Sequence, residues 1–182
     1  MEYVQPIRDK KVIEEFKTLL NRGVFGERNR FLFVLGINTA LRISDLLKLK
    51  VCDVRGKKYL KVSESKTGKT KNQLINNALK AEIEEYTKNK KDDEWLFPSR
   101  KGDKPLTRVQ AYRIMNEVAQ LMGVDDIGTH TLRKTFAYHF YQKTQDIYTL
   151  MELLNHSAPS VTRRYIGLVQ DDMDKEIENF SL

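Results

Sequence analysis

Apolar residues follow a helical period along most of this chain and lose it over one central stretch. Residues 51–54, 59–62 and 73–75 are short and rich in β-formers, and the turn signals at 55–57 and 67–69 separate them. Helical patterns lie on both sides of this stretch. The sequence therefore predicts a mainly α-helical α+β protein that contains a small antiparallel sheet of about three strands.

Capping residues set the limits of the predicted helices. Asp9 precedes a helix that ends near Gly23, a second helix is predicted over 27–38, and a short one follows Ile43. Asn77 and Thr107 are predicted to cap two more, and three or four helices are expected within 131–180. Near the end of the chain an apolar stripe recurs at helical steps, formed by Met173, Ile177 and Phe180.

Composition limits the kind of protein but does not identify it. The 182 residues carry a net charge of +7, which favours a polyanionic partner. Cys52 is the single cysteine, so an internal disulfide and a cysteine-rich zinc site are excluded. The longest apolar run, 31–37, is too short to span a bilayer. No linker divides the sequence, so residues 1–182 are expected to form a single domain.

Four segments combine cations with turns or helix starts, as a phosphate-binding site requires. Arg42 stands between two helices. His130 and Arg133 are three residues apart and share one helical face, where Thr129 is a possible cap. A basic turn at 65–70 joins two predicted strands, and a histidine-led turn at 155–160 precedes a helix that carries Tyr165. Each segment alone has a common structural explanation, such as a solvated lysine or a core tyrosine.

Together and in this order, the segments resemble the catalytic domain of the tyrosine recombinase (phage integrase) family. The matching positions are Arg42, Lys66, His130, Arg133, His156 and Tyr165. The flanking residues 39–47, 130–137, 153–157 and 164–167 also match, as does the connection at 95–99. The resemblance covers about 12–169. It departs at Ala40, where the family usually has glycine, and in the absence of the family's N-terminal core-binding domain, so the chain is expected to be an excised domain or a short stand-alone member.

The resemblance implies a role for each of these side chains. Tyr165 would attack a DNA phosphodiester and become joined to the 3′ phosphate. Two arginines, Arg42 and Arg133, would hold the non-bridging oxygens and His156 would donate to them. His130 would accept the tyrosine proton. Lys66 would protonate the leaving 5′ oxygen, with Lys69 and Lys71 as alternatives, and Asp45 would fix a neighbouring side chain. No metal or other cofactor is expected.

The implied function is site-specific DNA cleavage and rejoining, as in integration or recombination by a mobile element. Double-stranded DNA is the implied partner, with a monomer in solution, a tetramer on synapsed DNA, no membrane association and a cytoplasmic location in a bacterium or its phage. Two alternatives remain open. One is an accessory DNA-binding protein that keeps the fold, and the other is relaxation of DNA by a type IB topoisomerase-like reaction. The C-terminal stripe is expected either to pack on its own domain or to dock on a neighbouring protomer.

Overall fold

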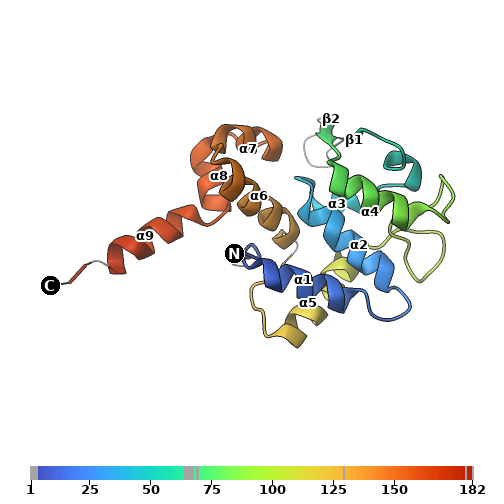
Figure 1. The fold of residues 1–182 in the computed structure, drawn as a ribbon, viewed down its shortest axis with the longest axis horizontal. Helices are drawn as coiled ribbons and strands as arrows, with labels where there is room; N and C mark the ends of the chain where they lie inside the picture. The colour runs from blue at the N-terminus through green and yellow to red at the C-terminus, as the bar shows by residue number, and fades with distance from the viewer. Residues whose placement is uncertain (1–3, 64–67, 69, 129, 179, 182) are drawn as a thin grey trace.

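The computed structural model describes residues 4–63, 68, 70–128, 130–178 and 180–181. Its helices pack against one small sheet that lies at the edge of the molecule, and the last helix extends away from the rest (Figure 1). The elements before the sheet are α1 (Lys10–Leu20), α2 (Gly26–Ile37), α3 (Ile43–Leu46) and the short 3₁₀ helix η1 (Val51–Asp53). The sheet is β1 (Tyr59–Ser63) and β2 (Thr70–Leu74). The elements after it are α4 (Asn77–Thr87), α5 (Arg108–Met122), α6 (Thr131–Thr144), α7 (Ile147–Leu154), α8 (Pro159–Tyr165) and α9 (Leu168–Glu178).

Most of the predicted helix boundaries are confirmed. The Asp9 carboxylate accepts a hydrogen bond from the amide of Lys11, and Thr107 caps α5 together with Gln110. Four helices, α6 to α9, occupy the region where three or four were predicted. The cap of α4 was predicted one residue too late, because the side chain that accepts from the amide of Leu79 belongs to Asn76.

The described part of the sheet has two antiparallel strands, so the prediction of three was wrong. Their register pairs Tyr59 with Leu74 and Ser63 with Thr70. Residues 51–53 form η1 because the Asp53 carboxylate accepts from the amide of Lys50 and closes a tight turn. The amides of Val51 and Cys52 donate to a neighbouring loop, to the carbonyls of residues 94 and 92. These bonds occupy the donors that a third strand would need.

Two apolar clusters form the interior, and α6 contributes to both. Leu132 belongs to the larger cluster, which α1 to α5 and the sheet build. Ala137, five residues later, belongs to a smaller cluster with Leu150 and Leu154 of α7. The contact of α6 with α2 is close, because a Cβ on Gly36 would lie 2.5 Å from a methyl group of Leu132. Arg133 therefore leaves α6 where the two clusters meet.

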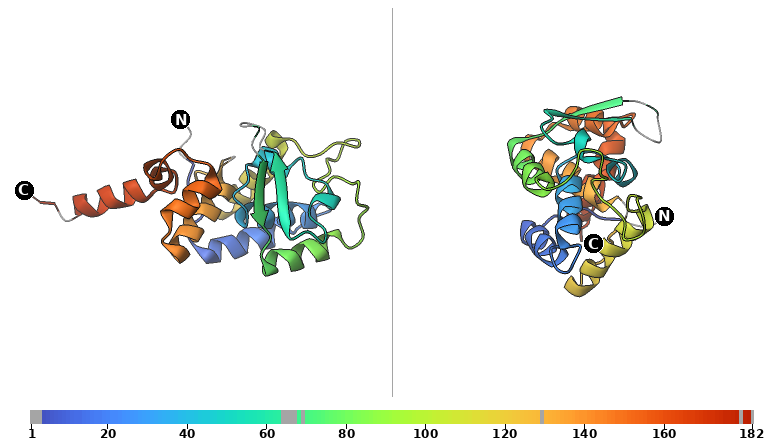
Figure 2. Two further views of the ribbon diagram at one scale, coloured as in Figure 1. Left: turned by 90° about the horizontal axis from the view of Figure 1, so that it is seen from above. Right: turned by 90° about the vertical axis from the view of Figure 1, so that its right-hand side faces the viewer.

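Helix α9 projects from the rest of the fold (Figure 2). It has no buried residue among those described. Gly167, at φ +85°, turns the chain after α8, and a Cβ there would lie 2.7 Å from the Arg8 guanidinium. Two ion pairs hold the first turns of the helix: Arg8 contacts Asp171 at 2.8 Å and Arg163 contacts Asp172 at 2.7 Å. Among the described residues, no helix is both long enough and apolar enough to cross a bilayer.

Candidate active site

Arg42 lies in the tight connection between α2 and α3, at the N-cap position of α3. The connection is braced from the sheet, since the Gln73 side chain accepts from the amide of Ala40 at 2.9 Å. Thr39 is fully buried and its hydroxyl donates to the Leu35 carbonyl at 2.9 Å. Asp45, three residues after Arg42, is only 2 % exposed. The backbone around Arg42 is thus fixed on both sides.

Arg133 is 4 % exposed, and its guanidinium donates to the carbonyl of Leu154 at 2.6 Å. That carbonyl is at the end of α7, so the bond ties α6 to the turn that carries His156. His130 occupies the N-cap position of α6. Thr129, the predicted cap, lies outside the described residues. The first turn of α6 is held instead by Thr131, whose hydroxyl accepts from the amide of Gly128 at 2.8 Å.

His156 follows the end of α7, where Asn155 takes a left-handed conformation at φ +54°. The amide of His156 donates to the Met151 carbonyl at 3.0 Å, which completes the helix end. Its Nδ1 lies 3.0 Å from the hydroxyl of Thr162, a fully buried residue of α8. This contact fixes the orientation of the imidazole relative to α8.

Tyr165 is the last residue of α8, and its ring meets the His156 ring edge to face at 5.0 Å between centroids. The hydroxyl of Tyr165 is buried and has no hydrogen-bond partner among the described residues. Burial raises the pKa of Tyr165 to about 12, although the charges of Arg133 and Arg42, and the approach of the Arg133 guanidinium to the hydroxyl, act to lower it. A buried hydroxyl without a partner, next to two guanidinium groups, is an arrangement suited to an anionic ligand.

The same two arginines act on both histidines. Burial, followed by Arg133, Lys71 and Arg42, lowers the pKa of His156 to about 4. Partial burial together with Arg133 lowers the pKa of His130 as well, although that side chain retains much solvent contact. Both rings are therefore neutral at pH 7 in the absence of an anion. Arg133 and Arg42 thus act on the pKa of His130, His156 and Tyr165, so the five side chains lie near one another. They are five of the six predicted positions.

The sixth position, Lys66, lies outside the described residues, as does its alternative Lys69. The other alternative, Lys71, is on β2, and its ammonium donates to the carbonyl of Leu153 at the end of α7. The hairpin is therefore in contact with the helix that precedes His156. This places Lys71, at the described end of β2, beside the site.

One cation close to the tyrosine did not stand out in the sequence. The ammonium of Lys134 lies over the Tyr165 ring, 5.2 Å from its centroid. Lys134 directly follows Arg133, and neighbouring residues on a helix point about 100° apart. Helical spacing alone therefore gave no reason to expect both side chains at one site.

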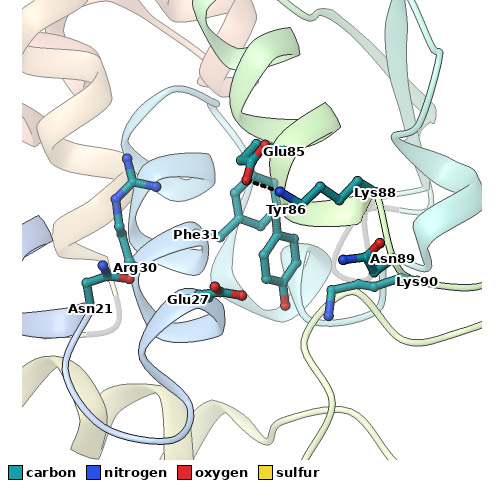
Figure 3. Close-up of a pocket in the computed structure, with 9 residues that line it drawn as sticks. All are labelled: Asn21, Glu27, Arg30, Phe31, Glu85, Tyr86, Lys88, Asn89 and Lys90. Carbon is teal, nitrogen blue, oxygen red and sulfur yellow. Dashed lines mark hydrogen bonds and ion pairs between the residues drawn. The ribbon is translucent and has the colours of Figure 1, made fainter.

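A separate pocket of about 330 Å³ lies between α2 and the end of α4 (Figure 3). The Tyr86 ring stacks on Phe31 at 4.3 Å, and the ammonium of Lys90 lies 4.5 Å from the centre of the Tyr86 ring. None of the predicted site residues lines this pocket. Among the described residues, no group of three or more His, Cys, Asp or Glu side chains is arranged to hold a metal ion.

This chain has recognisable relatives among known proteins. Residues 8–171 match the profile of the phage integrase family. The chain is 55% identical over 172 residues to the probable integrase/recombinase YoeC of Bacillus subtilis, covering 94% of this chain and 93% of that one. It is 31% identical to the tyrosine recombinase XerA of Pyrococcus furiosus, covering 85% of this chain and 55% of that protein. It thus spans nearly all of the first relative and about half of the second.

The fold is also that of solved recombinases. A Tn1549 transposon integrase in complex with a circular intermediate DNA superposes with a TM-score of 0.75 at 18% identity, over 96% of this chain and 67% of that one. At this identity the likeness speaks for the fold alone. Together, the match over 8–171 and the 55% identical relative establish that this chain belongs to the phage integrase family of tyrosine recombinases.

Proposed function

We propose that this chain cleaves and rejoins DNA strands at specific sites, with Tyr165 as the nucleophile. The observation that carries the proposal is the buried Tyr165 hydroxyl, which has no partner among the described residues and lies beside two arginines. A tyrosine that served only packing would bond its hydroxyl, because an unbonded buried hydroxyl is costly. Family membership and the charge of +7 support DNA as the substrate.

The proposed reaction is a direct displacement at phosphorus. The Tyr165 oxygen forms a bond to the scissile phosphorus while its proton passes to His130. The bond from phosphorus to the 5′ oxygen breaks, and that oxygen takes a proton from Lys66. The products are a 3′-phosphotyrosyl link and a free 5′ hydroxyl. Because the link keeps the free energy of the broken bond, a 5′ hydroxyl of another strand can reverse the step without ATP.

The remaining groups stabilise charge on the phosphate. Arg42 and Arg133 present planar donors suited to two non-bridging oxygens, and donors aimed at growing charge act mainly in the transition state. If the Thr162 hydroxyl donates to Nδ1 of His156, the neutral ring carries its proton on Nε2, where it can donate to the same phosphate. We assign Asp45 to holding its turn, since it is buried one turn after Arg42. This cluster of cations supplies the charge that metal ions supply in other phosphoryl transfers.

The test uses a nicked duplex in which the cleaved 5′ fragment diffuses away and traps the enzyme. The wild-type chain should form an adduct stable to SDS, and Tyr165→Phe should form none. Tyr148→Phe is a matched control, because Tyr148 lies on α7 rather than α8 and is 67 % exposed. Absence of a wild-type adduct would favour an accessory DNA-binding role. Relaxation of supercoiled DNA without any joining of two sites would favour a topoisomerase-like role.

We further propose that the chain is a monomer in solution and a tetramer on synapsed DNA, in the compartment that holds a bacterial or phage genome. The support is α9, which projects from the body with an uncovered apolar stripe. Met173, Ile177 and Phe180 are 47%, 69% and 69% exposed. The expectation that this stripe packs on its own domain does not hold for the described residues, so docking on a neighbouring protomer is the stronger explanation.

Removal of residues 173–182 tests this assembly. The truncated chain should keep its thermal transition, because none of the described residues of α9 is buried. It should bind a single site but assemble poorly on two, as judged by gel mobility or mass photometry. Loss of the thermal transition would show that the stripe belongs to the protomer's own core.

A further inference from the structure

The side chain of Lys134 connects the segment before α1 with the proposed nucleophile, Tyr165. The ammonium of Lys134 makes two contacts at once: it lies over the Tyr165 ring, and it donates to the carbonyl of Val4 at 2.7 Å. Burial lowers the pKa of Lys134. An ammonium held by a single carbonyl and one aromatic face has few alternative positions, so both contacts restrict where the ring and the ammonium can lie.

Val4 is itself held in place, together with the residues after it. The amide of Gln5 donates to the carbonyl of Asp126 at 3.2 Å, and the amide of Ile7 donates to the Thr135 hydroxyl at 2.9 Å. The carbonyl of Ile7 lies 2.9 Å from Nε2 of His139. Residues 4–8, here called the N-terminal strap, therefore run along α6 from Lys134 to His139.

A glycine makes the position of Val4 possible. A Cβ on Gly128 would lie 2.4 Å from one methyl group of Val4 and 3.4 Å from the other. The first distance is too short for any real pair of carbon atoms, so only glycine admits Val4 here. The position of the Val4 carbonyl, which accepts from the Lys134 ammonium, thus depends on the packing of Val4 against Gly128, outside the site.

We propose that Lys134 is a positioning residue that holds the ring of Tyr165 for attack, and that the N-terminal strap holds Lys134. The inference rests on the proposed function of Tyr165 and adds a residue to it. Lys134 touches the ring face and not the reacting oxygen, so its effect is on the orientation of the nucleophile. A misplaced nucleophile slows the chemical step without weakening substrate binding.

The first test separates rate from affinity. In Lys134→Met, adduct formation at saturating DNA should be slower by about tenfold, in keeping with the loss of one cation–π contact, while DNA affinity changes less than twofold. Lys134→Arg should restore most of the rate, because guanidinium also binds an aromatic face. Lys90→Met, which removes the matched lysine from the Tyr86 ring, should leave the rate unchanged.

The second test changes the strap without altering the site. Gly128→Ala should displace Val4 and slow adduct formation in the same way. The double variant Val4→Ala with Gly128→Ala should recover the rate, because only a Cβ at 3.5 Å then faces the new methyl group. This arm also covers the case in which Lys134→Met does not fold.

A DNA-free readout distinguishes failure of this inference from failure of the proposed function. With 3-fluorotyrosine at Tyr165, the ¹⁹F resonance should shift or broaden in Lys134→Met and not in Lys90→Met, whether or not any adduct forms. An unchanged resonance with an unchanged rate would overturn the inference. Equal losses of rate and DNA affinity would also overturn it, because they would make Lys134 an ordinary phosphate contact.

Discussion

Two tyrosines of this chain have similar surroundings and different hydroxyl groups. Tyr86 and Tyr165 are each partly buried, and each lies under a lysine ammonium, at 4.5 Å and 5.2 Å from the ring centre. The hydroxyl of Tyr86 donates to the carbonyl of Leu96 at 2.7 Å. The hydroxyl of Tyr165 has no partner among the described residues. Figure 3 shows Tyr86 in its pocket, between Phe31 and Lys90.

Nearby charges separate the two rings further. Burial raises the pKa of both hydroxyls, but at Tyr86 the carboxylates of Glu27 and Glu94 raise it further, against one arginine, Arg28. At Tyr165 the neighbouring charges are those of Arg133 and Arg42, and both act to lower the pKa. The difference teaches that a partly buried tyrosine under a lysine is not a sign of function. A buried hydroxyl with cations and no partner is the informative feature.

The largest expected effect follows from removing the arginines that lie near Tyr165 and not near Tyr86. Arg42→Ala or Arg133→Ala should slow adduct formation by about 10²-fold or more, as loss of a donor to transition-state charge does. Non-specific DNA affinity should change little, because many other cations share that task. Arg30→Ala, at the pocket of Tyr86, is the matched control and should cleave normally. A fall in affinity equal to the fall in rate would make the two arginines phosphate anchors only.

The free energy of unfolding should depend on the Tyr86 hydroxyl more than on the Tyr165 hydroxyl. Tyr86→Phe leaves the buried Leu96 carbonyl without its donor and should cost about 1–3 kcal/mol of unfolding free energy. Tyr165→Phe removes a hydroxyl that bonds to no described residue, so its unfolding free energy should stay within about 0.5 kcal/mol of wild type. Urea unfolding of both variants measures the difference. Equal losses would mean that the Tyr165 hydroxyl is also structural.

A smaller effect should appear in the pH dependence of stability. The pKa of His156 falls from 6.5 to about 4 on folding, so the unfolded chain binds the proton more tightly. Stability from this group is therefore complete above pH 6.5 and is lost as the pH falls towards 4. Between pH 7 and pH 4 the melting temperature of wild type should therefore fall by more than that of His156→Gln. A constant difference would contradict the lowered pKa.

The smallest expected effect is that of metal removal. The guanidinium groups of Arg42 and Arg133 lie near the Tyr165 hydroxyl, so the rate of adduct formation in excess EDTA should equal that in Mg²⁺ at matched ionic strength. The measurement is the initial rate of SDS-stable adduct. Strict dependence on a divalent ion would show that these cations do not suffice for the chemistry.

Much of the fold was predictable because its signals are local. Asp9 and Thr107 cap helices through their own neighbours, and the periodicity after 131 carries four helices. The prediction of a third strand was wrong because the competing contacts are not local. Residues 51–53 bond to the loop at 92–94, forty residues away, and Asp53 closes the turn. No local pattern reveals that competition.

The candidate site also has a part that the sequence predicts and a part that it does not. Arg42, His130, Arg133, His156 and Tyr165 were named from their order and spacing along the chain, and in the structure Arg42 and Arg133 lie close enough to act on the pKa of the other three. Their roles stay predictions. The supports were not predictable: Gln73 under Ala40, Thr162 beside His156, and the contact of Lys134 with Val4 join segments that are 33, 6 and 130 residues apart. Packing brings these groups together, and the sequence pattern does not record it.

The central claim is that Tyr165, and not a structurally similar tyrosine, forms the covalent link to DNA. The most direct measurement is to trap the adduct, digest both partners, and identify the tyrosine that carries the residual nucleotide by tandem mass spectrometry. We expect a modified peptide that contains Tyr165, with the peptide that contains Tyr86 unmodified. A nucleotide on Tyr86, or on any tyrosine other than Tyr165, would contradict it.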